Sequence, residues 1–153
     1  MIRSLLALVA TLCVALAFGQ DNTPPTVKLT LPKQAKPGAK VQAVVEITFA
    51  EGLHGYQNPP KEDYQIPVKV AFDCKGFVFA KPAYPKGVMR AIGGDPNPTP
   101  VYEGTLKIPV TVTVPKKPGA TEIKVTVSYQ QCNDSACFPP STVTGAAKLI
   151  VKK

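Results

Sequence analysis

Apolar and polar residues alternate along most of this chain with a period of two. In the stretch 106–114, apolar side chains occupy every second position, and lysine, proline or threonine fills the positions between them. Such alternation is typical of β-strands that bury one face and expose the other. The pattern predicts strands over residues 27–31, 41–49, 67–72, 77–79, 106–114, 123–129 and 147–151.

Prolines and glycines punctuate the chain between these predicted strands. The sequence contains 17 prolines and 11 glycines, and no segment has the periodicity of an amphipathic helix. The pair Pro118-Gly119 predicts a hairpin turn between the strands on either side of it. Short strands separated by turn residues predict an all-β fold, an antiparallel β-sandwich.

Two segments lack the alternation, and we predict that both are long loops without strands. They cover residues 51–66 and 82–102, which are rich in proline, glycine and asparagine. Connections of this length without regular structure are uncommon inside a compact domain, and those that occur are often functional.

The first residues of the chain have the pattern of a signal peptide. Arg3 precedes an apolar run from Leu5 to Phe18, and the small residues Ala15 and Ala17 fit a cleavage site. The run falls short of the roughly 18 apolar residues expected of a membrane span. We therefore predict a signal peptide over residues 1–19 and one mature domain over 20–153. That domain is expected in the periplasm or secreted, without membrane insertion after cleavage.

The charge balance is basic, at +8, with 18 lysines and arginines against 10 acidic residues. Beyond Arg3 the only arginine is Arg90, and the lysines are scattered along the sequence from Lys28 to Lys153. Proteins that read nucleic acids usually cluster their charge and interleave arginine with aromatic residues. We expect a solvated lysine-rich surface and no nucleic-acid partner.

Cys132 and Cys137 are the strongest candidates for chemistry. The four residues between them include Asn133 and Asp134, which favour tight turns, so the two sulfurs can come within disulfide distance. A ring this short stabilises a fold by only about 2 kcal/mol. On spacing and composition alone, a redox-active pair and a structural staple of a hairpin fit equally well.

The remaining candidates for chemistry give weaker signals. A zinc site would need more ligands than this sequence offers, and we expect no cofactor or metal. The unpaired Cys74 is expected to be buried and unreactive. His54 lacks partners for catalysis or metal binding, and we expect its ring to be partly buried with its polar atoms satisfied, beside Tyr56.

The context of the cysteine pair resembles the N-terminal periplasmic domain of DsbD, the thiol:disulfide interchange protein. The residues of this chain that carry the resemblance are Tyr129-Gln130-Gln131-Cys132 and Cys137-Phe138-Pro139-Pro140. Weaker similarity extends over residues 52–60 and 102–110. The resemblance implies an immunoglobulin-like sandwich that relays reducing equivalents outside the cytoplasm through Cys132 and Cys137.

The resemblance also implies partners and roles. A thioredoxin-like protein would reduce the pair, which would then reduce oxidoreductases such as isomerases and cytochrome c maturation proteins. Cys137 would form the mixed disulfide with a partner protein, and Cys132 would resolve it. Such a domain is only loosely an enzyme and would act as a component of a protein-disulfide reductase. The chain lacks the membrane-embedded part of DsbD, so we expect a separate membrane electron conduit.

A loop caps the cysteine pair in the family that this sequence resembles. Here the segment 86–99 occupies the corresponding place, with Met89, Ile92 and Asp95 in place of the acidic and aromatic residues of the best-known members.

The rival hypothesis for the function of this chain is a non-catalytic immunoglobulin-like binding module, in which the bridge is a structural staple.

Overall fold

The computed structural model describes residues 22–153, so the predicted signal peptide over residues 1–19 lies outside the described residues. The regular structure of this range consists of strands, without a helix. Within it, no helix is long and apolar enough to cross a membrane. The strands are β1 (Thr26–Thr30), β2 (Gln34–Ala35), β3 (Lys40–Thr48), β4 (His54–Tyr56), β5 (Lys69–Asp73), β6 (Val78–Phe79), β7 (Val88–Arg90), β8 (Thr99–Tyr102), β9 (Thr105–Thr113), β10 (Gly119–Tyr129), β11 (Gln131–Cys132) and β12 (Ser141–Val151).

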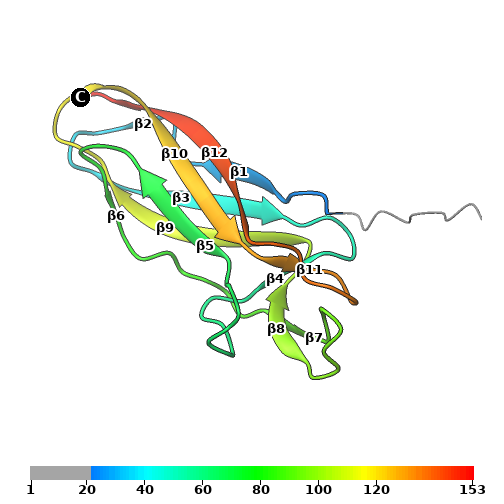
Figure 1. Ribbon diagram of the computed structural model, residues 1–153. Coiled ribbons are helices and arrows are strands. Elements are labelled where there is room, and N and C mark those ends of the chain that lie inside the picture. Colours follow the sequence, from blue (N-terminus) through cyan, green and yellow to red (C-terminus); the bar gives the residue numbers. More distant parts are fainter. Residues whose placement is uncertain (1–21) are drawn as a thin grey trace, which may run out of the picture.

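Two four-stranded sheets form the body of the molecule (Figure 1). The first has the order β1-β3-β9-β6 and the second the order β2-β12-β10-β5. The pairs are antiparallel except for β2, which runs parallel to β12. This arrangement confirms the predicted all-β, immunoglobulin-like antiparallel sandwich.

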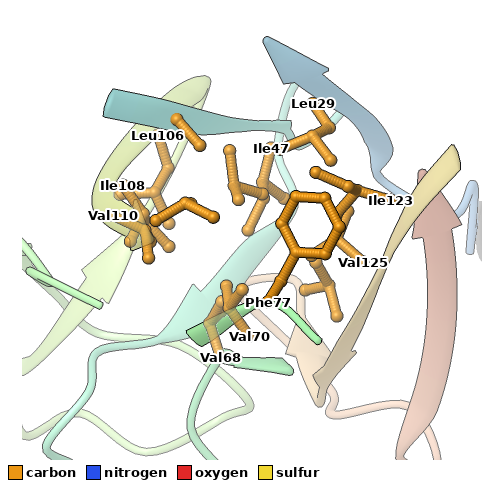
Figure 2. Packing of buried hydrophobic residues seen from close by; sticks show 14 of the residues in the cluster. Leu29, Ile47, Val68, Val70, Phe77, Leu106, Ile108, Val110, Ile123 and Val125 are labelled. Atoms are coloured by element: carbon orange, nitrogen blue, oxygen red, sulfur yellow. The ribbon is translucent and has the colours of Figure 1, made fainter. Parts of the chain in front are cut away.

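The core lies between the two sheets and follows the alternation of the sequence. In β9 the side chains of every second residue are buried, and the lysine and proline between them point to solvent. Ile108 of β9 and Val125 of β10 are fully buried, and Figure 2 shows them among the apolar side chains that fill the interior. Such burial is the main source of stability in a fold of this size.

A third sheet of short strands lies at one end of the sandwich, in the order β11-β4-β8-β7 (Figure 1). The prediction that residues 51–66 and 82–102 contain no strand was therefore wrong, because β4 lies in the first segment and β7 and β8 lie in the second. Strands this short carry too few positions for an alternating pattern. The three residues of β4 are all buried, so no polar face alternates with an apolar one.

The connection at Pro118-Gly119 also differs from the expectation. β9 and β10 belong to different sheets, so the chain crosses from one layer of the sandwich to the other, and the predicted hairpin was wrong. β10 pairs instead with β12 along its whole length, from Gly119 opposite Val151 to Tyr129 opposite Ser141. Both β9 and β10 bury one face, so they are suited to facing each other across the core.

Candidate redox site at the Cys132–Cys137 disulfide

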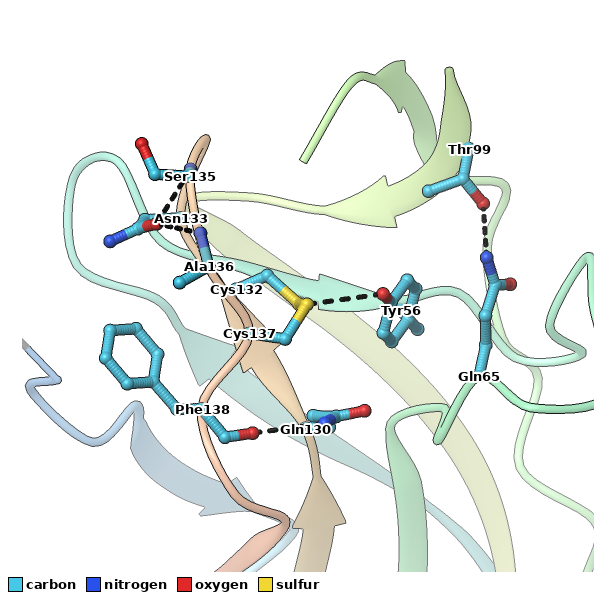
Figure 3. The surroundings of a disulfide bond; sticks show 10 residues. All are labelled: Tyr56, Gln65, Thr99, Gln130, Cys132, Asn133, Ser135, Ala136, Cys137 and Phe138. Atoms are coloured by element: carbon cyan, nitrogen blue, oxygen red, sulfur yellow. Dashed lines mark hydrogen bonds between the residues drawn. A yellow bond between two sulfur atoms is a disulfide. The ribbon is translucent and has the colours of Figure 1, made fainter. Parts of the chain in front are cut away.

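Cys132 and Cys137 are joined by a disulfide at the edge of the third sheet, just beyond the end of β10 (Figure 3). β10 leads into the bridge, since β11 follows it after one residue, and β11 pairs with β4 so that Cys132 lies opposite His54. The two cysteines also face each other as an antiparallel β-bridge. The structure thus brings together the two residues that the sequence singles out.

Asn133 organises the turn between the cysteines. Its side-chain oxygen accepts hydrogen bonds from the backbone N–H groups of Ser135 and Ala136, at 2.9 and 2.8 Å. Its own N–H donates to the carbonyl of Ala136 at 2.9 Å. Asparagine favours such turns because its side chain replaces a backbone acceptor. The bonds within this turn do not depend on the disulfide itself.

The two sulfur-bearing residues differ in their access to solvent. Cys132 is completely buried, in a small apolar cluster with Tyr56, Ile92 and Val101. Cys137 is exposed. A reacting partner therefore reaches the bridge from the side of Cys137, while Cys132 is held in the protein interior.

A loop after β7 lies over the bridge. The N–H of Gly93 donates to the carbonyl of Asn133 at 2.7 Å, and the N–H of Gly94 donates to that of Asp134 at 2.9 Å. Gly93 has a positive φ of 65°, and a Cβ at this position would lie 2.7 Å from the sulfur of Cys137. Glycine is therefore required both for the backbone conformation and for the close approach.

Ile92 anchors this loop, because its side chain is only 3% exposed and belongs to the cluster around Cys132. Met89, in contrast, is 55% exposed, and Asp95 is also exposed. Of the three residues that the sequence analysis places in the capping segment, Ile92 is thus the one buried against the cysteines.

Tyr56 is the polar side chain in contact with the bridge. Its hydroxyl lies 3.4 Å from the sulfur of Cys137 (Figure 3). Burial raises the pKa of the Tyr56 phenol above its usual value, and Tyr64 and Asp95 raise it further. The phenol therefore keeps its proton at neutral pH and can donate a hydrogen bond to a thiolate on Cys137. Sequence analysis did not assign Tyr56 to the site.

A hollow of about 430 Å³ opens beside Cys137. Its walls come from the segments 51–66 and 82–102, the first of which includes β4, and from Cys137 at the end of the turn over residues 133–136, which we call the redox turn. The lining residues are Tyr56, Lys61, Glu62, Tyr64, Gln65, Ile92, Gly93, Asp95, Asn97, Thr99 and Cys137. Gln65 is buried there and donates to the hydroxyl of Thr99 at 2.9 Å, which ties the two segments together. The 72% exposed Tyr64 forms part of the rim.

His54 and its neighbours form a charged cluster behind the bridge. Arg90 donates from Nε and Nη2 to the two carboxylate oxygens of Glu103, each at 2.8 Å, and these bonds hold the pKa of Glu103 below its usual value. Nε2 of His54 lies 3.4 Å from Glu103. The ring is buried more fully than expected, and its Nδ1 has no hydrogen-bond partner among residues 22–153.

Cys74 and Tyr129 do not take part in this site. Cys74 is half-buried just after β5, with its sulfur 3.9 Å from the carbonyl of Glu122. Burial raises the pKa of its thiol, which lowers its reactivity. Tyr129 is buried in the main core, edge-on to Phe49. The described range holds no group of three His, Cys, Asp or Glu residues arranged to bind a metal ion.

The contact between Tyr56 and Cys137 has a measurable consequence. In a Cys132→Ser background, the further change Tyr56→Phe should raise the pKa of the Cys137 thiol by about one unit, because one hydrogen bond to a charged group contributes about 1.5–3 kcal/mol. The pH dependence of the alkylation rate of Cys137 measures this pKa. Tyr64→Phe is the matched control, since Tyr64 lines the same hollow and should leave the pKa unchanged. An equal effect of both substitutions would exclude a specific role for the Tyr56 hydroxyl.

Comparison with known proteins finds a matching family model and a similar solved structure. The family model described as the N-terminal domain of the thiol:disulfide interchange protein DsbD matches residues 26–148. Among solved structures, the N-terminal periplasmic domain of ScsB from Proteus mirabilis is similar, with a TM-score of 0.51 and 12% sequence identity. The match covers 76% of this chain and 43% of that chain, and at this identity it shows the shared fold alone. No curated protein sequence matches this chain.

Proposed function

Since this chain belongs to the family of the N-terminal domain of the thiol:disulfide interchange protein DsbD, we propose that it relays reducing equivalents between redox proteins through Cys132 and Cys137. It acts as a thiol-disulfide exchange domain without a cofactor. Its substrates are the dithiols and disulfides of partner proteins.

The cycle consists of two exchange reactions. A thiolate of a reduced partner attacks the sulfur of Cys137, forms a mixed disulfide and releases Cys132 as a thiolate. The second thiol of that partner then attacks the partner's own sulfur, which leaves the partner oxidised and both cysteines of this domain reduced. In the reverse sense, Cys137 attacks the disulfide of a downstream partner, and Cys132 resolves the mixed disulfide.

The observation that carries this proposal is the unequal exposure of the two cysteines. Cys137 is exposed beside a hollow, and Cys132 is completely buried. A structural staple needs no such asymmetry, whereas an exchange reaction needs one sulfur that a partner can reach and one that stays close to resolve the bond. The modest stabilisation expected of so short a ring, about 2 kcal/mol, also suits a bridge that opens repeatedly.

Thioredoxin-like proteins are the partners that the family suggests, with a separate membrane electron conduit upstream and cytochrome c maturation proteins among the acceptors. Export belongs to the same proposal, with residues 1–19 as a cleaved signal peptide and 20–153 as the mature domain. Disulfides persist outside the cytoplasm, so an exchange bridge of this kind suits the periplasm.

Trapping of a mixed disulfide tests this function. The variant Cys132→Ser, in a Cys74→Ser background, leaves Cys137 as the free thiol. It is mixed with a thioredoxin whose attacking cysteine forms a disulfide with an aromatic thiol, which Cys137 can displace. We expect a covalent adduct through Cys137, detected by mass spectrometry. If the protein is taken from the exported fraction of the host, the same mass reports whether residues 1–19 have been removed.

The matched control is Cys137→Ser in the same background, which leaves the buried Cys132 and should react at least about tenfold more slowly, because buried thiols are poorly reactive. Absence of the Cys137 adduct, or equal rates for both variants, would refute the relay. A reduction potential below about −300 mV, which is typical of structural bridges, would also contradict it.

A further inference from the structure

Half of the 16 lysines of this sequence lie at one end of the folded domain. They lie on the connections β1–β2, β2–β3, β5–β6 and β9–β10, at the start of β3 and after β12, and all of them are exposed: Lys33, Lys36, Lys40, Lys75, Lys116, Lys117, Lys152 and Lys153. We call this set the basic pole.

Contacts between the connections show that they adjoin one another. The N–H of Gly38 donates to the carbonyl of Pro115, and the N–H of Lys152 donates to that of Ala35. A Cβ on Gly76 would lie 3.6 Å from the side chain of Pro115. Figure 1 shows the C-terminus beside β2, at the end of the sandwich away from β4, β8 and β11.

The basic pole lacks compensating carboxylates. The segments 31–40, 74–77, 114–119 and 151–153 contain no aspartate or glutamate. The nearest acidic side chains on the adjoining strands are Asp73, which lies opposite Lys124, and Glu122, which lies opposite Lys148. Asp73 and Glu122, with the lysines opposite them, belong to the strands of the second sheet and not to the segments of the pole. Within residues 22–153, no ion pair joins a lysine of the pole to an acidic side chain.

The opposite end of the domain, around the disulfide, has a different charge balance. Glu62 and Asp95 line the hollow beside Cys137, and Glu51 and Asp134 line a groove along the redox turn. The cations of this end are Lys61, which lines the hollow, Lys86, which lines a groove beside Glu103, and Arg90, which is paired with Glu103. β10 runs from one end to the other over 11 residues, which corresponds to about 35 Å. The domain is thus an electrical dipole along its long axis.

We propose that the basic pole binds the surface of an anionic phospholipid bilayer and directs the disulfide away from it. Lysines near such a surface are attracted to acidic headgroups, and the effect is confined to about one Debye length, roughly 8 Å at physiological salt. The acidic residues at the other end are repelled, so the same field that holds the domain also orients it. Cys137 then faces partners rather than lipid.

The composition of the pole favours a membrane over other anionic partners. It contains lysine but no arginine, and lysine interacts as a hydrated point charge rather than through paired hydrogen bonds. Nucleic-acid sites usually add exposed aromatic residues or arginine, and protein interfaces are anchored by tryptophan, tyrosine or arginine. Two large apolar side chains beside the pole, Val78 and Ile150, are 66% and 42% exposed and can make shallow contact with the interface.

Vesicle binding by two charge-matched variants tests the proposal. The pole variant carries Lys116→Gln, Lys117→Gln, Lys152→Gln and Lys153→Gln. The strand variant removes as many charges elsewhere, through Lys28→Gln, Lys69→Gln, Lys107→Gln and Lys124→Gln. Binding is measured by co-sedimentation with vesicles of phosphatidylglycerol and phosphatidylcholine in equal parts, and with phosphatidylcholine alone.

We expect the unaltered protein to bind the anionic vesicles at low salt and not the neutral ones. Each lysine near the surface contributes about a fivefold factor in affinity, so the pole variant should lose more than about tenfold and the strand variant far less. Equal losses, a larger loss in the strand variant, or no binding to the anionic vesicles would overturn the proposal. Pole-dependent binding to polyglutamate without binding to vesicles would overturn it as well, in favour of an acidic protein partner.

Discussion

A Gly93→Val substitution should accelerate reduction of the Cys132–Cys137 disulfide by dithiothreitol about tenfold or more. A side chain at Gly93 meets the sulfur of Cys137 at 2.7 Å, and its φ of 65° is unfavourable for a β-branched residue. The loop would have to leave the bridge and expose Ile92. Full burial of an isoleucine contributes about 1.5–3 kcal/mol to the closed position of this loop. Since each 1.4 kcal/mol corresponds to a tenfold change in population, loss of that position should raise the population of the open, reducible form about tenfold or more. Reduction is followed by quenching with an alkylating agent and measuring the mass.

The control for this experiment is Gly104→Val. Gly104 also has a positive φ, of 57°, but a Cβ there meets no atom within 4 Å. It therefore reproduces the backbone strain without a contact to the sulfur, and its reduction rate should match that of the unaltered protein. If Gly93→Val leaves the rate unchanged or slows it, the loop is not the barrier to reduction. Ile92→Ala offers a second route to the same opening and should also accelerate reduction.

The body of the sandwich could be predicted from the sequence because its strands are long enough to show an alternating pattern. β9 and β10 bury every second side chain for most of their length, and that periodicity shows where each strand lies, but not which strands pair. The sheet around the disulfide could not be predicted in this way. β4 and β11 are short, lie far apart in the chain, and owe their conformation to pairing with each other. Propensity within a short window carries no information on such a pairing.

The same distinction applies to the residues of the site. Cys132 and Cys137 could be identified because their spacing, turn residues and flanking prolines are local in the sequence. Tyr56 lies 81 positions from Cys137, and its contact with the sulfur arises only when β4 and β11 pair. A signal was present in Gly93-Gly94, since two adjacent glycines often indicate a backbone that must pass close to another group.

The charge distribution shows how a pattern can be hidden by chain order. Scattered lysines in the sequence predict an evenly decorated surface, but antiparallel strands return the chain to the same end at every second connection. The connections after β1, β2, β5 and β9, and the residues after β12, all reach that end, and each carries lysine without an acidic residue. Counting charges by connection, rather than along the chain, would have revealed the basic pole.

The hydrophobic core, rather than the disulfide, should supply most of the stability of this domain. Replacing the fully buried Ile108 with alanine should lower the free energy of unfolding by about 3 kcal/mol, within the range of about 2–5 kcal/mol typical of such changes. Reducing the disulfide should lower it by only about 2 kcal/mol, because the bridge closes a short ring. Urea unfolding monitored by circular dichroism gives both values, as a shift of the midpoint at constant slope.

The exposed neighbour Lys107 provides the control, since Lys107→Ala removes only a surface ion pair with Glu46 at 3.5 Å and should change the free energy by less than about 1 kcal/mol. The reduced protein should still unfold in one cooperative transition. This follows because the bonds of Asn133 and the pairing of β11 with β4 do not require the bridge. If reduction instead unfolds the domain, the bridge is a structural staple, because a relay must keep its fold in both redox states.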